Sequence, residues 1–199
     1  MKTLFLALAL ISVSLVSCAQ DITLPAAQRS GGMPLMEALN NRKSTRQFDS
    51  SRPLSQQQLA DLLWAACGYN REDKLTIPTA LNRQEVTIYV IMPDGAYRYD
   101  ARNNVLVQVT DQDIRPMAGK QPFAVEALLN IAIVSDKAKM DHDIFAGVAV
   151  GAVVQNIYLW CASNGIGTVT RGGFDGESLA KALNLGETER VMMVQTVGY

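Results

Sequence analysis

The run 144–164 constrains the fold of this chain more than any other feature of its sequence. Its residues are apolar almost all round at helical spacing, which predicts the longest helix of the molecule. Gly147 and Gly151 lie four residues apart, so one interpretation is a transmembrane dimerisation helix. Gln155 and Asn156 lie near its middle and favour burial inside a soluble domain instead. Because one small core cannot cover a helix that is apolar on every face, we also expect a second subunit.

Strands are predicted on both sides of that helix. The run 86–92 is rich in β-branched residues and ends at Pro93-Asp94-Gly95, a turn signal. The continuous apolar run 128–134 fits a central strand. Further strands are predicted at 97–99, 105–109 and 191–197, and shorter helices at 34–41 and after Ser55, where Ser55 and Gln58 have the form of a capping box. The roughly 170 residues after the N-terminal region therefore suit one domain with both helices and strands.

The composition excludes some classes of function. The formal net charge is −1, whereas a nucleic-acid-binding domain needs a clustered positive excess, so we expect no nucleic-acid partner. Cys67 and Cys161 lie in apolar helical patterns and are predicted to be buried thiols rather than a disulfide. The single histidine, His142, lies between two aspartates and is interpreted as a solvated residue at a helix start. No Cys/His spacing predicts a metal site.

Two short runs carry the chemistry. Arg42, Lys43, Ser44 and Arg46 offer three cations and a hydroxyl, which suit a phosphate dianion. The other interpretation is that the cations complement the dipole of a preceding helix. The run 165–175 contains four glycines, and their backbone amides can approach a flat ligand closely because glycine has no Cβ. Its other interpretation is a glycine-rich connection from helix to strand. Together the two runs indicate a phosphorylated aromatic cofactor.

With the segment 78–84 between them, these runs resemble the FMN-dependent nitroreductase family in its compact form, from about Leu35 to the end of the chain. The resemblance implies an α+β, nitroreductase-like fold for residues 34–199, with a mixed, mostly antiparallel sheet flanked by helices. It also implies a homodimer that holds two FMN groups at its interface.

The resemblance assigns roles to residues in the first part of the chain. In the family, an Arg-x-Ser-x-Arg/Lys run contacts the FMN phosphate and ribityl chain, and Arg42, Lys43, Ser44 and Arg46 match that run. A Pro-Ser-x-x-Asn-x-Gln run comes from the neighbouring subunit and lies near the flavin ring. Its match here implies four flavin neighbours, which are Pro78, Thr79, Ala80 and Asn82.

Residues in the second part of the chain receive roles in the same way. Gln121 matches a position whose amide hydrogen-bonds the pyrimidine edge of the flavin, and a backbone N–H of Gly172 or Gly173 would reach flavin N5. Thr170 and Gly172 stand where many relatives have proline and an acidic residue, so we expect a different ring environment. A donor at N5 stabilises the negatively charged reduced ring, and no catalytic side chain is assigned.

The implied activity is ping-pong hydride transfer from NAD(P)H through FMN to flat, electron-poor small aromatic acceptors such as nitroaromatics or quinones. One alternative is an FMN dehydrogenase that acts on azolines or peptides, since the family includes azoline oxidases. Another is a non-catalytic, flavin-binding lipoprotein of the cell envelope, since reduced nicotinamides are scarce outside the cytoplasm.

The N-terminus indicates a location. Residues 1–17 have the charged start, short apolar region and small-residue end of a signal peptide. The sequence Leu15-Val16-Ser17-Cys18 resembles a bacterial lipobox, in which the thiol of Cys18 is acylated. Residues 18–33 are interpreted as a lipidated tether to the outer membrane or the periplasmic face, with no other membrane contact. The alternative is a plain secretory signal and a soluble periplasmic or secreted protein.

Overall fold

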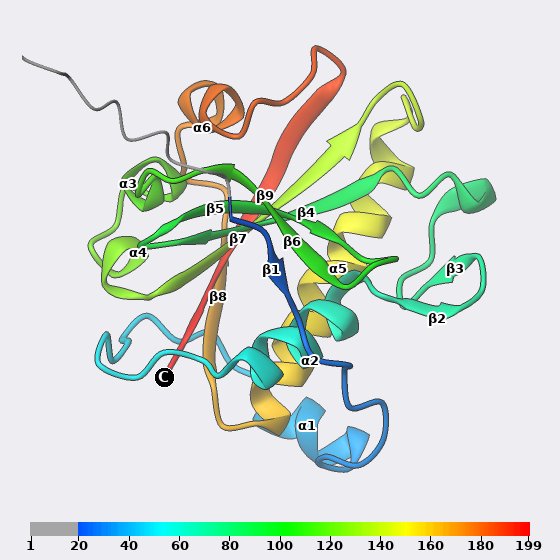
Figure 1. Ribbon diagram of the computed structural model, residues 1–199. Helices are drawn as coiled ribbons and strands as arrows, with labels where there is room; N and C mark the ends of the chain where they lie inside the picture. Colours follow the sequence, from blue (N-terminus) through cyan, green and yellow to red (C-terminus); the bar gives the residue numbers. More distant parts are fainter. Residues whose placement is uncertain (1–19) are drawn as a thin grey trace, which may run out of the picture.

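The computed structural model describes residues 20–199, and the predicted signal peptide and Cys18 lie outside this range. Its centre is a seven-stranded sheet with the order β1-β6-β5-β4-β7-β9-β8 (Figure 1). The strands are β1 (Ile22–Thr23), β4 (Val86–Met92), β5 (Gly95–Asp100), β6 (Val105–Thr110), β7 (Leu129–Asp136), β8 (Gly167–Arg171) and β9 (Glu189–Gly198). All neighbouring strand pairs in this sheet are antiparallel, which confirms the predicted mostly antiparallel sheet. The prediction of a mixed sheet also implied some parallel pairing, and the described strands have none.

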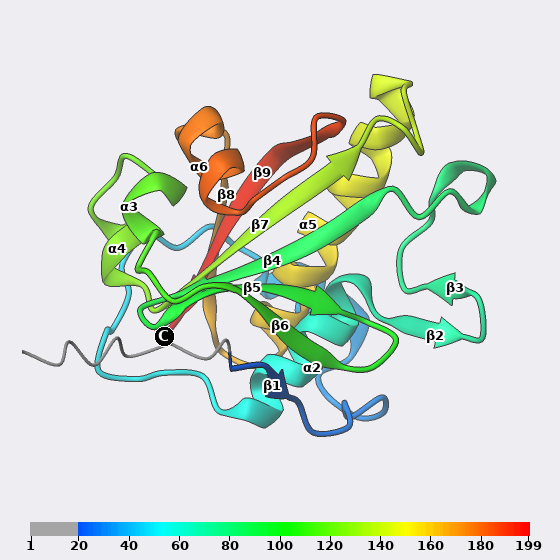
Figure 2. The same cartoon turned by 45° about the horizontal axis from the view of Figure 1, so that its top comes forward.

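Helices cover both faces of the sheet, which makes the fold α+β (Figure 2). On one face, α2 (Gln56–Cys67) and α5 (Asp143–Ser163) enclose the larger core, in which Leu62, Ile131 and Ile157 are fully buried. The other face carries α3 (Arg115–Ala118), α4 (Phe123–Glu126) and α6 (Gly176–Ala182), and its smaller core is centred on Leu179. The short helix α1 (Leu35–Asn41) packs against α5.

Local sequence signals explain several element boundaries. The side chain of Ser55 accepts from the backbone N–H of Gln58, and Gln58 Oε1 accepts from the backbone N–H of Ser55, so the predicted capping box starts α2. Cys67 and Cys161 are buried and free, as predicted. His142 is the exposed N-cap residue of α5. After α2 the chain forms a small hairpin of β2 (Tyr69–Arg71) and β3 (Lys74–Leu75), then a 3₁₀ turn at Ala80–Asn82, all within a stretch where no element was predicted.

The long helix α5 is partly buried. Its inner face, which includes Ala149, Val153 and Ile157, packs in the larger core, as expected for a helix inside a domain. Its outer face is exposed near the N-terminal end, where Ile144 is 69% and Val148 58% accessible. By length and composition α5 could also cross a membrane, but its packing against α1, α2 and the sheet is that of a core helix.

The expected tether has more structure than its composition suggests. Ile22 and Thr23 form the edge strand β1 and pair with β6, opposite Leu106 and Val105. Leu24 is buried, and its backbone N–H donates to Asn104 O at 3.0 Å. Residues from Ile22 on therefore belong to the folded domain, because the pairing with β6 fixes them.

Candidate functional site

The basic run of Arg42, Lys43, Ser44 and Arg46, called the clamp below, lies along β8, the outer strand of the sheet. The backbone N–H of Thr45 donates to Thr168 O at 2.9 Å. Gly167 eases this approach, because a Cβ at that position would lie only 3.0 Å from Thr45 Cγ2 and 3.2 Å from Gly198 O, so these neighbours would have to shift. The basic run and the glycine-rich strand, more than a hundred residues apart in sequence, are thus neighbours in space.

Tyr158 joins these two segments, and sequence reasoning missed it. Its buried hydroxyl shares a 2.9 Å hydrogen bond with Ser44 Oγ and accepts from the backbone N–H of Thr170 at 3.1 Å. Its ring lies 5.1 Å from the guanidinium carbon of Arg42, a cation–π contact. In the sequence this tyrosine is only one more residue of an apolar helix, so nothing distinguished it before the fold was known.

In the part of the chain that the structure describes, the cations of the run have no acidic partner. Among residues 20–199, none of the ion pairs involves Arg42, Lys43 or Arg46. Lys43 and Thr45 line a cavity of about 540 Å³ together with residues 165–168 and Tyr158. Arg46 is exposed. An excess of positive charge beside a cavity of this size suits an anionic small molecule.

Two orphaned polar atoms mark the end of β8. Thr170 Oγ1 is buried and has no hydrogen-bond partner in the described part of the chain. Arg171 is 6% exposed, and its Nε is also unpartnered. The terminal nitrogens of Arg171 donate to Ala118 O at 2.9 Å, Asn130 Oδ1 at 2.8 Å and Thr196 Oγ1 at 2.6 Å. A Cβ on Gly119 would overlap this guanidinium, so the glycine is required there.

The turn between α3 and α4 brings Gln121 to the glycine run. The backbone N–H of Lys120 donates to Gly173 O at 3.4 Å, and a Cβ on Gly173 would lie 3.7 Å from Gln121 Nε2. Gly172 is exposed, and a Cβ there would meet nothing within 4 Å. The backbone at Gly172 and Gly173 is therefore open to a ligand, with the Gln121 amide beside it.

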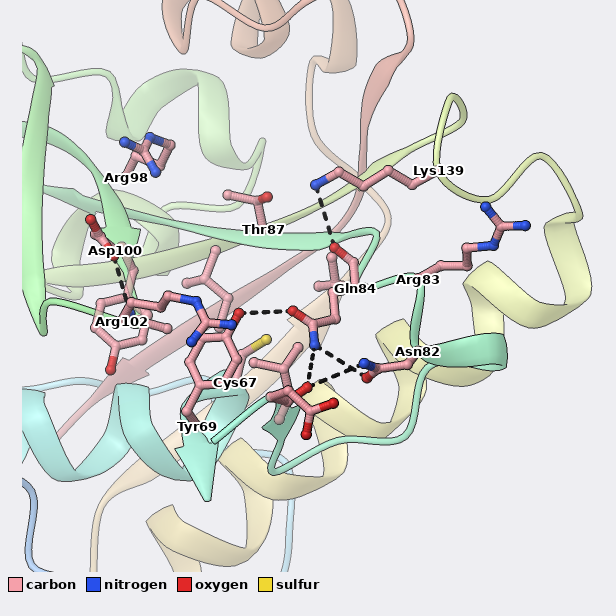
Figure 3. Close-up of a pocket in the computed structure, with 16 residues that line it drawn as sticks. Cys67, Tyr69, Asn82, Arg83, Gln84, Thr87, Arg98, Asp100, Arg102 and Lys139 are labelled. Atoms are coloured by element: carbon pink, nitrogen blue, oxygen red, sulfur yellow. Dashed lines mark hydrogen bonds between the residues drawn. The ribbon is translucent and has the colours of Figure 1, made fainter. Parts of the chain in front are cut away.

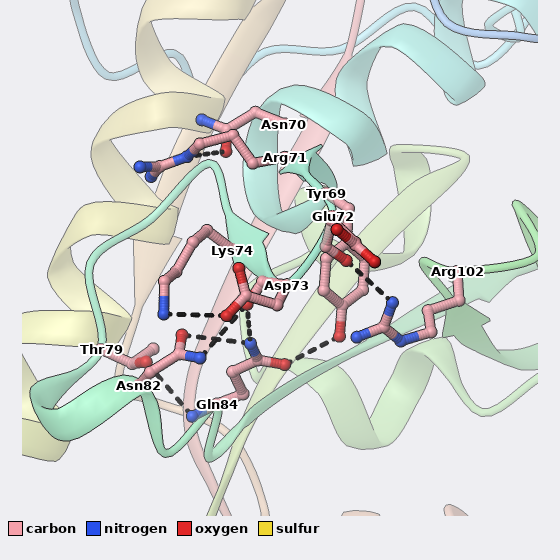
Figure 4. Close-up of polar contacts among 10 residues, drawn as sticks. All are labelled: Tyr69, Asn70, Arg71, Glu72, Asp73, Lys74, Thr79, Asn82, Gln84 and Arg102. Carbon is pink, nitrogen blue, oxygen red and sulfur yellow. Dashed lines mark hydrogen bonds and ion pairs between the residues drawn. The ribbon is translucent and has the colours of Figure 1, made fainter.

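The segment 78–84 does not join this site within one chain. Figures 1 and 2 place it beside β2 and β3, at the opposite end of the molecule from the 42–46 segment. Gln84 and Asn82 tie it to the hairpin, where Gln84 Nε2 donates to Asp73 O at 2.7 Å and Asn82 Nδ2 to the same oxygen at 3.2 Å (Figure 4). Thr79 Oγ1 accepts from the backbone N–H of Gln84.

Comparisons with known proteins agree with this architecture. Residues 39–199 match the model of the nitroreductase family. The chain belongs to the nitroreductase family. A crystal structure of a candidate nitroreductase from Ralstonia eutropha superposes with a TM-score of 0.83 at 40% identity, covering 89% of this chain and 88% of that one. A candidate nitroreductase of Methanocaldococcus jannaschii is 28% identical over 87% of this chain and 94% of its own length.

Another member of the family was solved with its cofactor. That structure, from Desulfovibrio desulfuricans and in complex with FMN, superposes with a TM-score of 0.64 at 20% identity, covering 84% of this chain and 87% of the other. At this identity the likeness shows a shared fold. Together the comparisons make the chain an oxidoreductase of the nitroreductase kind.

The structure brings together three of the four sequence segments expected around the cofactor. They contribute Arg42, Lys43, Ser44 and Arg46; Gln121; and Thr170, Gly172 and Gly173. Pro78, Thr79, Ala80 and Asn82 lie apart from them, at the hairpin of β2 and β3. Within residues 20–199 no group of acidic, histidine and cysteine side chains could hold a metal ion.

Proposed function

We propose that this nitroreductase-family protein is an FMN-dependent oxidoreductase that takes electrons from NAD(P)H and passes them to flat, electron-poor acceptors such as nitroaromatics or quinones. Bound FMN would supply the ping-pong hydride transfer. One observation supports this proposal most. Three cations that have no carboxylate partner among residues 20–199 lie beside a glycine-rich strand end with open backbone amides.

The residues present fit this cofactor. Arg42, Lys43 and Arg46 would hold the phosphate, with Ser44 positioned by Tyr158. The backbone of Gly172 or Gly173 would donate to the ring, and Gln121 would serve its pyrimidine edge. The orphaned hydroxyl of Thr170 needs a partner, which a ligand at the end of β8 could provide. No side chain is assigned as an acid or base.

We further propose that the protein acts as a homodimer, in which Pro78, Thr79, Ala80 and Asn82 reach the flavin ring of the partner subunit. In one chain these residues lie at the opposite end of the molecule from the clamp (Figure 1), so only a second copy brings them to a flavin site. The 3₁₀ turn at Ala80–Asn82 leaves Leu81 84% exposed, which fits a segment that contacts another chain.

Removal of the clamp tests the cofactor assignment. Arg42→Ala combined with Arg46→Ala should give folded, colourless protein, because about 1.5–3 kcal/mol is lost with each charge-assisted hydrogen bond to the phosphate. The control is Lys137→Ala with Lys181→Ala, which removes two exposed cations elsewhere. Flavin content comes from the absorption spectrum after incubation with excess FMN, and turnover from anaerobic bleaching by NADH or NADPH. Equal flavin content in the two double variants would contradict the assignment.

We propose a location in the cell envelope, with a lipid on Cys18 as the membrane anchor. The support is the order of charged, apolar and small residues before that cysteine. Replacement of Cys18 by Ser should release the protein into the soluble fraction after cell lysis. A variant that stays in the membrane pellet would rule out this anchor.

A further inference from the structure

A cavity separate from the 42–46 site lies between the β2–β3 hairpin, the segment 82–84 and the turn that joins β5 to β6 (Figure 3). Its volume is about 520 Å³, within the range of small-molecule sites, about 300–1,000 Å³. The inner wall is apolar and buried, and is formed by Leu75, Val86, Ile88 and Tyr99. Such a wall suits the flat or apolar part of a ligand.

The rim carries more positive than negative charge. Four cations line the cavity against two carboxylates, Asp73 and Asp100, and the cations are Arg83, Arg98, Arg102 and Lys139. Asp73 is already paired with Lys74 at 3.1 Å. Asp100 accepts from Asn103 Nδ2 at 2.8 Å and from two backbone N–H groups. Both carboxylates are thus engaged by their own neighbours, and the residues that line the cavity carry an excess of positive charge.

Two of the cations approach the cavity from opposite sides. Figure 3 shows Lys139 reaching in from the segment after β7 and Arg102 lying over Tyr69 from the other side. Lys139 Nζ is 3.5 Å from Gln84 O. The guanidinium carbon of Arg102 is 4.1 Å from the centre of the Tyr69 ring, and Nη1 donates to Glu72 O. The stacked pair presents a flat, positively charged surface.

The wall formed by 82–84 is held in an uncommon backbone conformation. Asn82 and Gln84 have φ of +54° and +50°, in the left-handed region that non-glycine residues rarely adopt. Gln84 Oε1 accepts from the Tyr69 hydroxyl at 2.8 Å, and its Nε2 donates to Asp73 O. Strained backbone of this kind is found preferentially at ligand sites, and these hydrogen bonds keep the wall in place before any ligand arrives.

The cavity is suited to binding rather than to covalent chemistry. Its one thiol, Cys67, is 5% exposed, and burial together with the charge of Glu85 raises its pKa to about 12. The thiol therefore stays protonated at neutral pH and is no nucleophile. We propose that this cavity binds a flat organic anion that carries a phosphate group, such as a nucleoside monophosphate, with the base on the apolar wall and the phosphate at Arg98, Arg102 and Lys139. The proposal goes beyond the FMN site. Asn82 lines this cavity and is also proposed to reach the flavin of the partner subunit, so in the homodimer the cavity would lie beside that site, but none of the three cations assigned to the phosphate is an FMN residue.

Calorimetric titration at low salt tests the proposal, with 2′-AMP, 5′-AMP and adenosine as probes. We expect at least one of the two phosphates to bind at least tenfold more tightly than adenosine. The triple variant Arg98→Gln, Arg102→Gln and Lys139→Gln should lose at least tenfold in affinity for that phosphate. The matched control is Arg71→Gln with Lys137→Gln, two exposed residues near the same segments that do not line the cavity, and it should bind as the wild type does.

The outcomes separate the sources of the phosphate. Tighter binding of 2′-AMP assigns the site to NADPH, and tighter binding of 5′-AMP assigns it to a free nucleotide. Equal affinity for adenosine and both phosphates, or an unchanged triple variant, overturns the proposal. Should the triple variant fail to fold, the single change Lys139→Gln serves instead, with an expected loss of at least threefold. Flavin content is measured on the same samples, so a protein without FMN refutes the proposed oxidoreductase and leaves this result to stand alone.

Discussion

At the scale of the residue, Arg171 has the most unusual energetics. A buried guanidinium loses several kcal/mol of hydration, and no carboxylate of the described residues compensates for this loss. Burial lowers the pKa of Arg171 to about 10, so the group is still charged at neutral pH. Its hydrogen bonds to Ala118, Asn130 and Thr196 offset the loss, since each contributes about 1.5–3 kcal/mol. These bonds also connect β8 to β7, β9 and the end of α3.

Replacing this arginine should destabilise the protein. Arg171→Met removes the Arg171 donor from Ala118 O, Asn130 Oδ1 and Thr196 Oγ1, and only Asn130 Oδ1 keeps another side-chain donor, the Thr196 hydroxyl. We expect a loss of about 3 kcal/mol in the free energy of unfolding. The matched control is Arg190→Met, which removes a half-exposed ion pair with Asp143 and should cost less than about 1 kcal/mol. Urea unfolding measures both. Equal stability of Arg171→Met and the wild type would contradict the prediction and show that the desolvation of the cation cancels the gain from its hydrogen bonds.

At the scale of the element, α5 has two different apolar faces. One face packs in the core, whereas Ile144, Phe145 and Val148 are exposed, with the two exposed glycines Gly147 and Gly151 beside them. Small residues let another backbone approach closely, and exposed apolar residues gain free energy when covered. This exposed face therefore supports the proposed homodimer, for which we expect α5 to form part of the interface.

A charge on that face should separate the subunits. Val148→Glu places a carboxylate where the second copy would exclude water, so we expect a monomer in analytical ultracentrifugation with an unchanged circular dichroism spectrum. The control is Val125→Glu, the same substitution at a 39% exposed valine of α4. Because α4 lies away from the exposed face of α5, this variant should keep the mass of the wild type. Two variants of equal mass would contradict the assignment of the interface to α5.

At the scale of the whole molecule, the predicted elements were those that the local sequence specifies. The hairpin of β4 and β5 turns at Gly95, whose φ of +146° few other residues adopt, and the capping box marks the start of α2. β1 could not be predicted, because two residues form a strand only through pairing with distant β6. The sequence predicted that α5 has more apolar surface than one core can cover. It could not predict which residues stay exposed, because that depends on the side of the helix that packs in the core.

The candidate site was predictable to a similar extent. The basic run and the glycines stand out in sequence because their residue types are unusual together, and the structure places them side by side. Tyr158 and Arg171 were missed because each acts through contacts with several distant segments. An arginine directly after alternating β-branched residues was the available signal for Arg171, since a charge at a buried strand position requires partners.

The pairing of Ile22 and Thr23 with β6 has a consequence for how the protein would sit on a bilayer. With an acyl chain on Cys18, only three residues separate the lipid from the first paired residue. At no more than about 3.6 Å per residue, that span cannot exceed roughly 15 Å. The edge of the sheet formed by β1 and β6 would then stay close to the headgroups, which would restrict the ways in which the domain can turn relative to the bilayer.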